Sequence, residues 1–438
     1  MTGSARTTGA TAARPSFERL AWYLSAPSLA LDCYPASPWE DVSLDEPPAA
    51  GGGDGRAGLR ERFESAVDDC LAGHDHVALL YVNDLASAVL TERTAEACRR
   101  SGRRLLVIVA DGVAADGTSL AARSQEAIAR LARGAMVRIV EPDRWFRAMP
   151  RRGNPVAPDI RHTEFVARAS LLAAEGGATV LLSPSGADAV LGAPRFLAPH
   201  LSPGAMPARL RDSWRESGPG GLLAEGFAGF GGRARPGRGG AVRLAVSGLA
   251  VPAAPPPEGL TEAARDAARA WASTWLDEVT AALAGARPAA VEASYRRRIA
   301  VRERVVAGYG TVLEDGRGEC AASVPRRRLP FLDDGVVGHA AAMPLARRYD
   351  PALPSPYQRT RAALVRLMPS HHRGCLPMAP PLPGPDDAYR PRVPDEGFRH
   401  CADAGLLARP APPRGLQGPV LRRLAILEDW LATVTVSP

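Results

Sequence analysis

Five histidine and cysteine residues in the last quarter of the chain carry side chains that bind zinc in many proteins. They are His371, His372, Cys375, His400 and Cys401. Structural zinc sites repeat a few short spacings of thiolate and imidazole ligands, and this set fits none of the common templates. We therefore interpret these residues as ordinary loop residues, with a zinc site as the alternative.

Arginine supplies all the strong positive charge, because the 54 Lys+Arg residues are all arginine. No reaction step can use a lysine amine, and a guanidinium does not titrate below about pH 12. The net charge of +7 favours an anionic partner such as a nucleotide, a nucleic acid or an acidic peptide. One basic cluster comprises Arg296, Arg297, Arg298, Arg302 and Arg304. A solvated helix face is the preferred interpretation of this cluster, and a grip on an acidic peptide or nucleic acid is the alternative.

Length and composition indicate a soluble globular protein with long connectors. The chain has 438 residues, of which 46% are hydrophobic, with 43 glycines and 41 prolines. These values exclude fibrous and collagen-like proteins, and no apolar run approaches the ~20 residues of a membrane span. The 6 cysteines form no CxxC pair, and we find no signal peptide. We therefore expect a cytoplasmic location.

Apolar patterning predicts alternating strands and helices in the first half. Short apolar runs predict buried parallel strands at 77–82, 105–110, 136–140 and 178–183. Helical spacing predicts helices at 59–72, 85–101, 119–133 and 162–175. This alternation predicts a doubly wound α/β sheet, with ligands at the carboxyl ends of its strands.

The second half is richer in glycine and proline and is expected to be helical between its connectors. A loop or insertion is expected at 218–240, and helices are expected at 261–284, 288–307, 334–347, 358–368 and 418–433. The predicted parts are a disordered or linker segment at 1–58, an α/β core at 59–214, a Gly/Pro-rich insertion or linker at 215–260, and a helical part at 261–438.

The sharpest motif is Pro330-Phe331-Leu332-Asp333, which Pro344 follows. Asp333 is expected to cap the next helix, whose buried face would hold Val336, Val337 and Ala340. With this motif, the segment VLLSPSGADAVLG at 180–192 and the helix RAALVRLMP at 361–369, the chain resembles the synthetase domain of the asparagine synthetase family. That family includes the β-lactam synthetases and the lasso-peptide macrolactam synthetases.

The resemblance covers roughly residues 59–370 and implies a sheet of the adenine nucleotide alpha-hydrolase type, the PP-loop ATP pyrophosphatase fold. It also implies ATP and Mg²⁺ as cofactors. In the family reaction, ATP activates a carboxylate as an acyl-adenylate, pyrophosphate leaves, and an amine attacks to form an amide. Such chemistry needs backbone N–H groups at a helix N-terminus for the pyrophosphate and acidic residues for the metal.

The resemblance places the pyrophosphate loop at the end of the first strand, on Val82, Asn83, Asp84, Leu85, Ala86 and Ser87. Only Ser87 keeps the family residue. Asn83 and Asp84 replace two glycines, and Ala86 replaces the metal-binding aspartate. Side chains at the glycine positions would crowd a phosphate, and Asp84 would repel it.

The second box puts Ser185 and Gly186 beside the nucleotide and gives Asp188 a metal-binding role. The next residue is Ala189, where the family has a second acid, so a turn or cap role for Asp188 is preferred. The family lysine falls at Tyr357 or Gln358; Arg359 or Arg361 could supply charge but no proton. Arg326, Arg327 and Arg328, just before the PFLD motif, are candidates for a phosphate contact.

Three functions from different classes follow. The favoured one is a diverged, catalytically impaired member of the family that serves as a partner of an active synthetase, or that holds a peptide or small-molecule substrate in a biosynthetic pathway. The first alternative is an active divergent amide ligase of the macrolactam or asparagine synthetase type. The second is an arginine-rich nucleic-acid-binding protein. No residue is assigned a catalytic role, because every aligned catalytic position has lost its chemistry.

Overall fold

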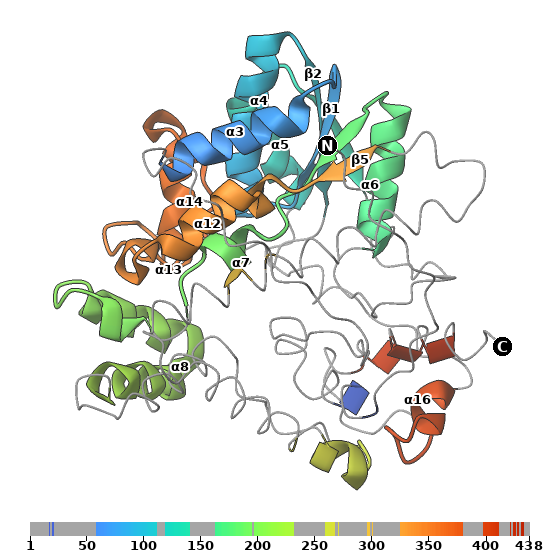
Figure 1. Cartoon of the computed structure of the whole chain (residues 1–438), viewed down its shortest axis with the longest axis vertical. Coiled ribbons are helices and arrows are strands. Elements are labelled where there is room, and N and C mark those ends of the chain that lie inside the picture. The colour runs from blue at the N-terminus through green and yellow to red at the C-terminus, as the bar shows by residue number, and fades with distance from the viewer. Residues whose placement is uncertain are drawn as a thin grey trace.

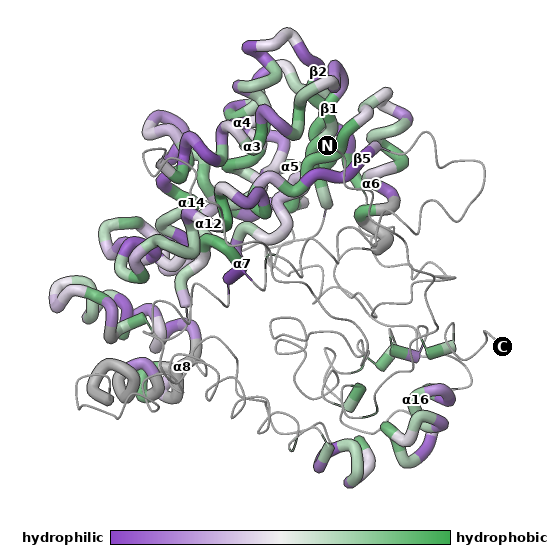
Figure 2. The backbone as a smooth tube through the Cα atoms, in the orientation of Figure 1, coloured by the Kyte–Doolittle hydropathy of each residue, from purple (hydrophilic) through white to green (hydrophobic). Residues whose placement is uncertain are grey.

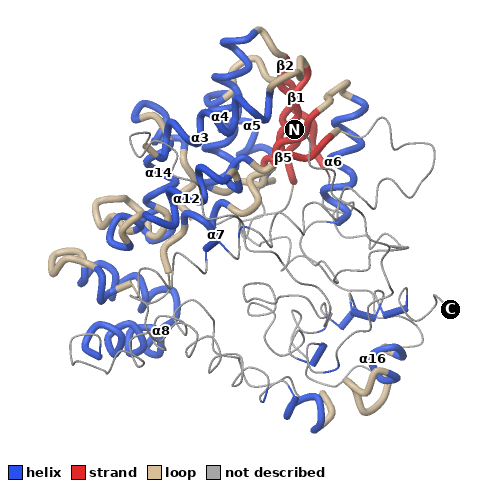
Figure 3. The backbone as a smooth tube through the Cα atoms, in the orientation of Figure 1, coloured by secondary structure: helices blue, strands red, loops and turns tan. Residues whose placement is uncertain are grey.

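The core of the protein is one five-stranded parallel sheet in the order β3-β2-β1-β4-β5 (Figures 1 and 3). Its strands are β1 (His76–Tyr81), β2 (Arg104–Ala110), β3 (Met136–Val140), β4 (Val180–Leu182) and β5 (Arg326–Arg328). From β1 the chain adds β2 and β3 on one side, and it then returns to add β4 and β5 on the other side of β1. This order is that of doubly wound Rossmann-like folds. The predicted fold class is confirmed.

The computed structural model describes residues 58–111, 119–140, 163–194, 197–231, 259–267, 325–379 and 397–410, with isolated positions elsewhere between 17 and 432. Most of the predicted segments 1–58, 288–307 and 418–433 lie outside the described residues. Among the helices that are described, none has the length and apolarity to cross a lipid bilayer.

Helices cover both faces of the sheet because the strands are apolar on both sides. In β1, Leu79 and Tyr81 face one hydrophobic cluster, whereas Ala78 and Leu80 face another. The first cluster is closed by α3 (Leu59–Leu71), α4 (Leu85–Ser101) and α5 (Leu120–Leu131), and the second by α6 (Thr163–Glu175). Figure 2 shows β1 and β2 as hydrophobic and the edge strand β5 as hydrophilic.

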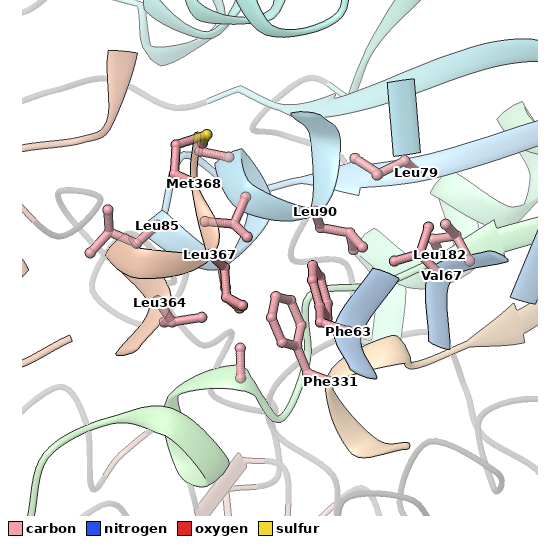
Figure 4. Close-up of a cluster of buried hydrophobic side chains, with 14 of the residues drawn as sticks. Phe63, Val67, Leu79, Leu85, Leu90, Leu182, Phe331, Leu364, Leu367 and Met368 are labelled. Atoms are coloured by element: carbon pink, nitrogen blue, oxygen red, sulfur yellow. The ribbon is translucent and has the colours of Figure 1, made fainter. Parts of the chain in front are cut away.

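The PFLD motif joins the carboxyl-terminal part to this core. Pro330–Leu332 form a 3₁₀ turn, and the Phe331 ring stacks on Phe63 of α3 with centroids 4.5 Å apart (Figure 4). Asp333 caps α12 (Asp334–Ala342) by accepting the N–H groups of Gly335 and Val336, as predicted. Leu364 and Leu367 of α14 (Ala362–Leu367) reach the same hydrophobic cluster.

Two of the predicted helices differ from the structure. The helix expected at 334–347 ends at Ala342, and a 3₁₀ turn, Leu345–Arg348, follows Pro344 because proline cannot continue an α-helix. The helix expected at 358–368 is two short helices, α13 (Pro356–Arg359) and α14, separated at Thr360 and Arg361.

The prediction of a loop at 218–240 is wrong for residues 219–231, which are helical. The helical segment α8 (Met206–Gly231) passes through Gly218, whose φ of 64° breaks the helix, and resumes at Pro219. Glycine adopts this left-handed conformation without a Cβ clash, and proline suits the first position of a helix. The glycine and proline that indicated a loop are therefore a kink between two helical halves.

Two buried arginines hold the short helix α7 (Ala187–Leu191) by its carboxyl end. Arg348 is 0% exposed and donates to the carbonyl of Val190 at 2.8 Å and to that of Ala340 in α12. Arg296 donates to the carbonyls of Ala189, Val190 and Gly192 at 2.7–3.0 Å. Arg296 is 3% exposed, so both interpretations of its basic cluster, a solvated face or a grip on a partner, are wrong for this residue.

Replacing Arg348 by methionine should lower the free energy of unfolding by roughly 3 kcal/mol, because buried carbonyls of α7 and α12 would lose their donor. Urea denaturation of the two proteins measures the difference. The matched control is Arg347→Met at the exposed neighbouring position, with an expected change of no more than ~0.5 kcal/mol. Equal effects of the two substitutions would contradict this role of Arg348.

Candidate functional site

The predicted site residues meet at the carboxyl ends of β1 and β4. These strands are neighbours and pair in parallel from Val77↔Val180 to Leu79↔Leu182. The loop after β1 therefore lies beside the loop after β4. Residues 82–87 belong to the first, and Ser185, Gly186 and Asp188 to the second. The structure brings together the two segments that sequence analysis singled out, at the edge where α/β sheets bind ligands.

Asp84 occupies the N-terminus of α4 with its own carboxylate. Its Oδ1 atom accepts the backbone N–H of Ser87 at 2.6 Å, and its own N–H donates to Ser87 Oγ at 3.1 Å. This reciprocal capping box satisfies helix N–H groups that are otherwise free to bind an anion. The position that the resemblance assigns to the pyrophosphate loop thus holds a carboxyl group of the protein itself.

Asn83 keeps the backbone bend that the loop requires. Its φ is 60°, the left-handed region that asparagine tolerates better than most residues, and no other non-glycine residue in the described part of the chain has a positive φ. Its side-chain Oδ1 accepts a hydrogen bond from Ser124 Oγ of α5 at 2.6 Å. Glycine is therefore not needed for the bend, and the side chain ties the loop to the neighbouring helix.

Tyr357 accepts a hydrogen bond from a second backbone N–H group at the N-terminus of α4. The phenol oxygen accepts the backbone N–H of Leu85 at 3.3 Å, and the residue is 7% exposed. Desolvation raises the pKa of this phenol, and the nearby charges of Asp84 and Asp188 raise it further. It remains a neutral hydroxyl, in a position to which the resemblance assigns a lysine.

Asp188 forms an ion pair with Arg361 across the two boxes. Arg361 donates from Nε at 2.9 Å and from Nη2 at 2.7 Å, a bidentate arrangement. The guanidinium also lies over the Tyr357 ring, 4.2 Å from its centroid. A Mg²⁺ ion on Asp188 would have to displace this arginine. The turn or cap role that sequence analysis prefers for Asp188 does not account for this ion pair.

The β4 loop is stabilised by contacts of its own. Ser183 and Ser185 share a hydrogen bond between their hydroxyl oxygens at 2.9 Å, and Arg327 of β5 donates to Ser185 Oγ at 3.1 Å. Gly186 has a φ of 84°, and a Cβ on it would lie 2.3 Å from Leu332 Cδ2. Gly186 is thus required for close packing against the PFLD turn. Of the three arginines predicted to contact phosphate, Arg327 reaches this loop.

The surroundings of Asp84 shift the pKa of its carboxyl group. Desolvation raises the pKa of Asp84, hydrogen bonds from Ser87 lower it, the charge of Asp188 raises it, and Arg361 lowers it; the net shift is upward. Arg361 is thus the cation that makes two neighbouring acids tolerable. Within this cluster Arg361 pairs with Asp188, and Asp84 and Tyr357 accept backbone N–H groups of α4.

The candidate zinc residues belong to different elements. His371, His372 and Cys375 lie in the 3₁₀ segment Ser370–Cys375, whereas His400 and Cys401 lie in α16 (Arg399–Asp403). The carboxylate of Glu428 contacts both α16 residues: Oε2 accepts the backbone N–H of Cys401 at 2.8 Å, and Oε1 lies 2.8 Å from His400 Nδ1. Within the described ranges no three His, Cys, Asp or Glu side chains are arranged to hold a metal ion.

Sequence reasoning identified both loops but missed the contacts that fill them. From the sequence, Tyr357 and Arg361 are candidates only for the place of a lysine. Their bonds to Leu85 and Asp188 depend on how α13 and the start of α14 pack. No protein-family model matches the chain, and no curated protein matches it either.

The raised pKa of Asp84 predicts a pH-dependent effect of Asp84→Asn on stability. The folded protein binds this proton more tightly than the unfolded chain, so the contribution of the carboxyl to stability falls as pH rises from the ordinary Asp pKa of about 4 through the raised value. Asparagine keeps the cap but cannot ionise. The variant should equal or exceed the parent in stability at neutral pH, and its advantage should shrink on acidification.

Urea denaturation at a series of pH values measures this difference. A parent that is the more stable protein at neutral pH, and that loses this advantage on acidification, would show that the ionised carboxylate is favourable in the folded state.

Proposed function

We propose that this chain is a diverged relative of the asparagine synthetase family that no longer forms acyl-adenylates. It serves a biosynthetic pathway as an accessory protein, as the partner of an active synthetase or as the holder of its peptide or small-molecule substrate. The support is a five-stranded parallel sheet of suitable order, with the PFLD motif packed on its first helix. The two boxes of the resemblance also meet at one sheet edge.

One observation supports a loss of activity: groups of the protein itself occupy the positions that the resemblance assigns to phosphate and metal. Asp84 and Tyr357 take the N–H groups of Ser87 and Leu85 at the N-terminus of α4. Arg361 takes the carboxylate of Asp188. An ATP molecule would have to break each of these contacts before it could make its own.

The size of the electrostatic repulsion between Asp84 and a phosphate disfavours nucleotide binding at the N-terminus of α4. Two unit charges 4 Å apart interact by about 1 kcal/mol in water and about 4 kcal/mol at an effective dielectric constant of 20. A pyrophosphate group bears several negative charges beside Asp84. Binding at millimolar affinity provides only about 4 kcal/mol in total. When Asp84 is ionised, repulsion from its carboxylate is therefore large enough to cancel a weak nucleotide site.

The competing function is an active ATP-dependent amide ligase with ATP and Mg²⁺ as cofactors. It is favoured by the polar groups that remain at this edge, namely Ser185, Asp188 and Arg327. In that case Arg361 would swing from Asp188 to a phosphate and leave the carboxylate to the metal. Arginine there could stabilise developing charge but could not transfer a proton.

Calorimetric titration with Mg-ATP separates the two functions. For the accessory role, we expect no binding tighter than about millimolar, and an identical trace for Asp188→Ala. Binding that is present in the parent and lost in Asp188→Ala would overturn the accessory role. Release of pyrophosphate on adding carboxylate and amine substrates would then establish a ligase.

Removing the two blocking groups should recreate an anion site. The double variant Asp84→Gly with Tyr357→Phe frees the N–H groups of Ser87 and Leu85, and it should bind inorganic pyrophosphate at least about tenfold more tightly than the parent. Asp333→Gly is the matched control, because it also uncaps a helix, α12, and should gain no such affinity. Equal affinities of the double variant and the parent would show that Asp84 and Tyr357 do not block the site.

A further inference from the structure

The first half of α8 is held rigidly against the carboxyl-terminal part. Asp212 is 0% exposed and accepts from Arg359 at 2.6 and 2.7 Å and from the Tyr349 hydroxyl at 2.9 Å. Arg209, one turn earlier, bonds to the buried Glu225 of the second half at 3.2 Å. These buried contacts fix which side of the helix faces away from the core.

The opposite side presents Arg211, Trp214 and Arg215, which we call the outer face of α8. Their spacing of three and four residues places them on one face of a helix. Trp214 is 50% exposed and both arginines are exposed. An exposed tryptophan is unusual, because burying its large ring would be more favourable in free energy than leaving it in water.

The two guanidinium groups of the outer face have no partner among the residues that the structure describes. Neither Arg211 nor Arg215 forms a hydrogen bond or ion pair with any side chain that the structure describes. The two like charges stand four residues apart, which costs the helix a few tenths of a kcal/mol. Nearby Glu216 bonds instead to Arg209 at 3.4 Å.

We propose that the outer face of α8 docks an acidic segment of a partner protein, with carboxylates on the two arginines and an apolar side chain on the Trp214 ring. Tryptophan and arginine are the residues most enriched at interaction hot spots. Charge complementarity supplies the acidic partner, since the face is doubly positive and the whole chain is at +7. The rigid anchoring of α8 lowers the entropy cost of binding. This inference rests on the proposed accessory role and names the chemistry of the partner.

A small patch of this kind suits a peptide better than a nucleic acid. Nucleic-acid affinity grows with the number of phosphates that are neutralised, and the outer face offers two cations. An acidic peptide with one apolar residue needs two charge contacts and one apolar contact, which is what the face provides.

The test is fluorescence anisotropy with a fluorescein-labelled peptide built from glutamate and leucine. The same peptide with glutamine in place of glutamate is the uncharged probe. We expect the acidic peptide to bind the full-length protein, to weaken with added salt, and to bind at least about tenfold more weakly to Arg211→Gln/Arg215→Gln and to Trp214→Ala. The uncharged peptide should not bind. Thermal denaturation checks that the variants are folded.

Arg104→Gln/Arg133→Gln is the matched control, because it removes two exposed arginines, at the start of β2 and just after α5. It lowers the net charge equally and should leave binding unchanged. Equal losses in both double variants would reduce the effect to overall charge and overturn the docking site. Tighter binding of a single-stranded oligonucleotide that depends on the same residues would replace the peptide by a nucleic acid. Absence of peptide binding also overturns it.

A Mg-ATP titration of the same preparation keeps the two proposals apart. Nucleotide binding would overturn the accessory role whatever the peptide does. A silent titration together with absent peptide binding would overturn the docking surface alone, because the outer face of α8 contains none of the residues of the candidate site.

Discussion

Hydrogen bonds from two buried arginines to the last carbonyls of α7 are the interaction on which the rest of the arrangement depends. α7 has only five residues and could not keep its place by its own backbone bonds. Arg296 and Arg348 come from distant parts of the chain and converge on it, and Arg348 also binds α12. Because α7 carries Asp188, these arginines set where that carboxylate stands. Its pairing with Arg361, and hence the character of the sheet edge, follows from this position.

The carboxyl ends of β1 and β4 combine backbone geometry that suits ligand binding with side chains that contact one another. Backbone positions that could approach a ligand are all present: a left-handed bend at Asn83, a helix N-terminus at Asp84 and a tight turn at Gly186. The side chains placed on these positions contact one another and the backbone: Asp84 accepts from Ser87, Tyr357 accepts from Leu85, and Arg361 pairs with Asp188. The pairing with Arg361 reduces the cost of holding two neighbouring carboxylates, but desolvation still raises the pKa of Asp84.

The α/β half of the fold could be predicted from sequence because four strands are short, mostly apolar runs between helices of clear periodicity. The strand at 136–140 was expected to be buried, and this is wrong for β3, which contains Arg138 and leaves Met136 and Ile139 exposed. β5 was missed because three consecutive arginines carry no strand signal, and only pairing with β4 makes them extended. The helix α8 was missed over its whole length, and its second half was predicted as a loop because glycine and proline also mark a kink. For the site, strand ends located Asp84 and Asp188, but Tyr357 and Arg361 reach them through tertiary packing. Arg296 likewise became a buried clamp through contacts that no local pattern records.

The pairing of β4 with β5 has a consequence for how the protein is made. Residues Val180–Leu182 leave the ribosome long before Arg326–Arg328, yet they are adjacent in the sheet. Contacts so remote in sequence form slowly because a long loop must close first. Until then β4 is an open edge strand with apolar side chains and unpaired backbone N–H and C=O groups. Chains aggregate on edges of this kind. The late arrival of a strand made only of arginines both pairs that edge and leaves the finished sheet bordered by positive charge, which discourages a second molecule from adding to it.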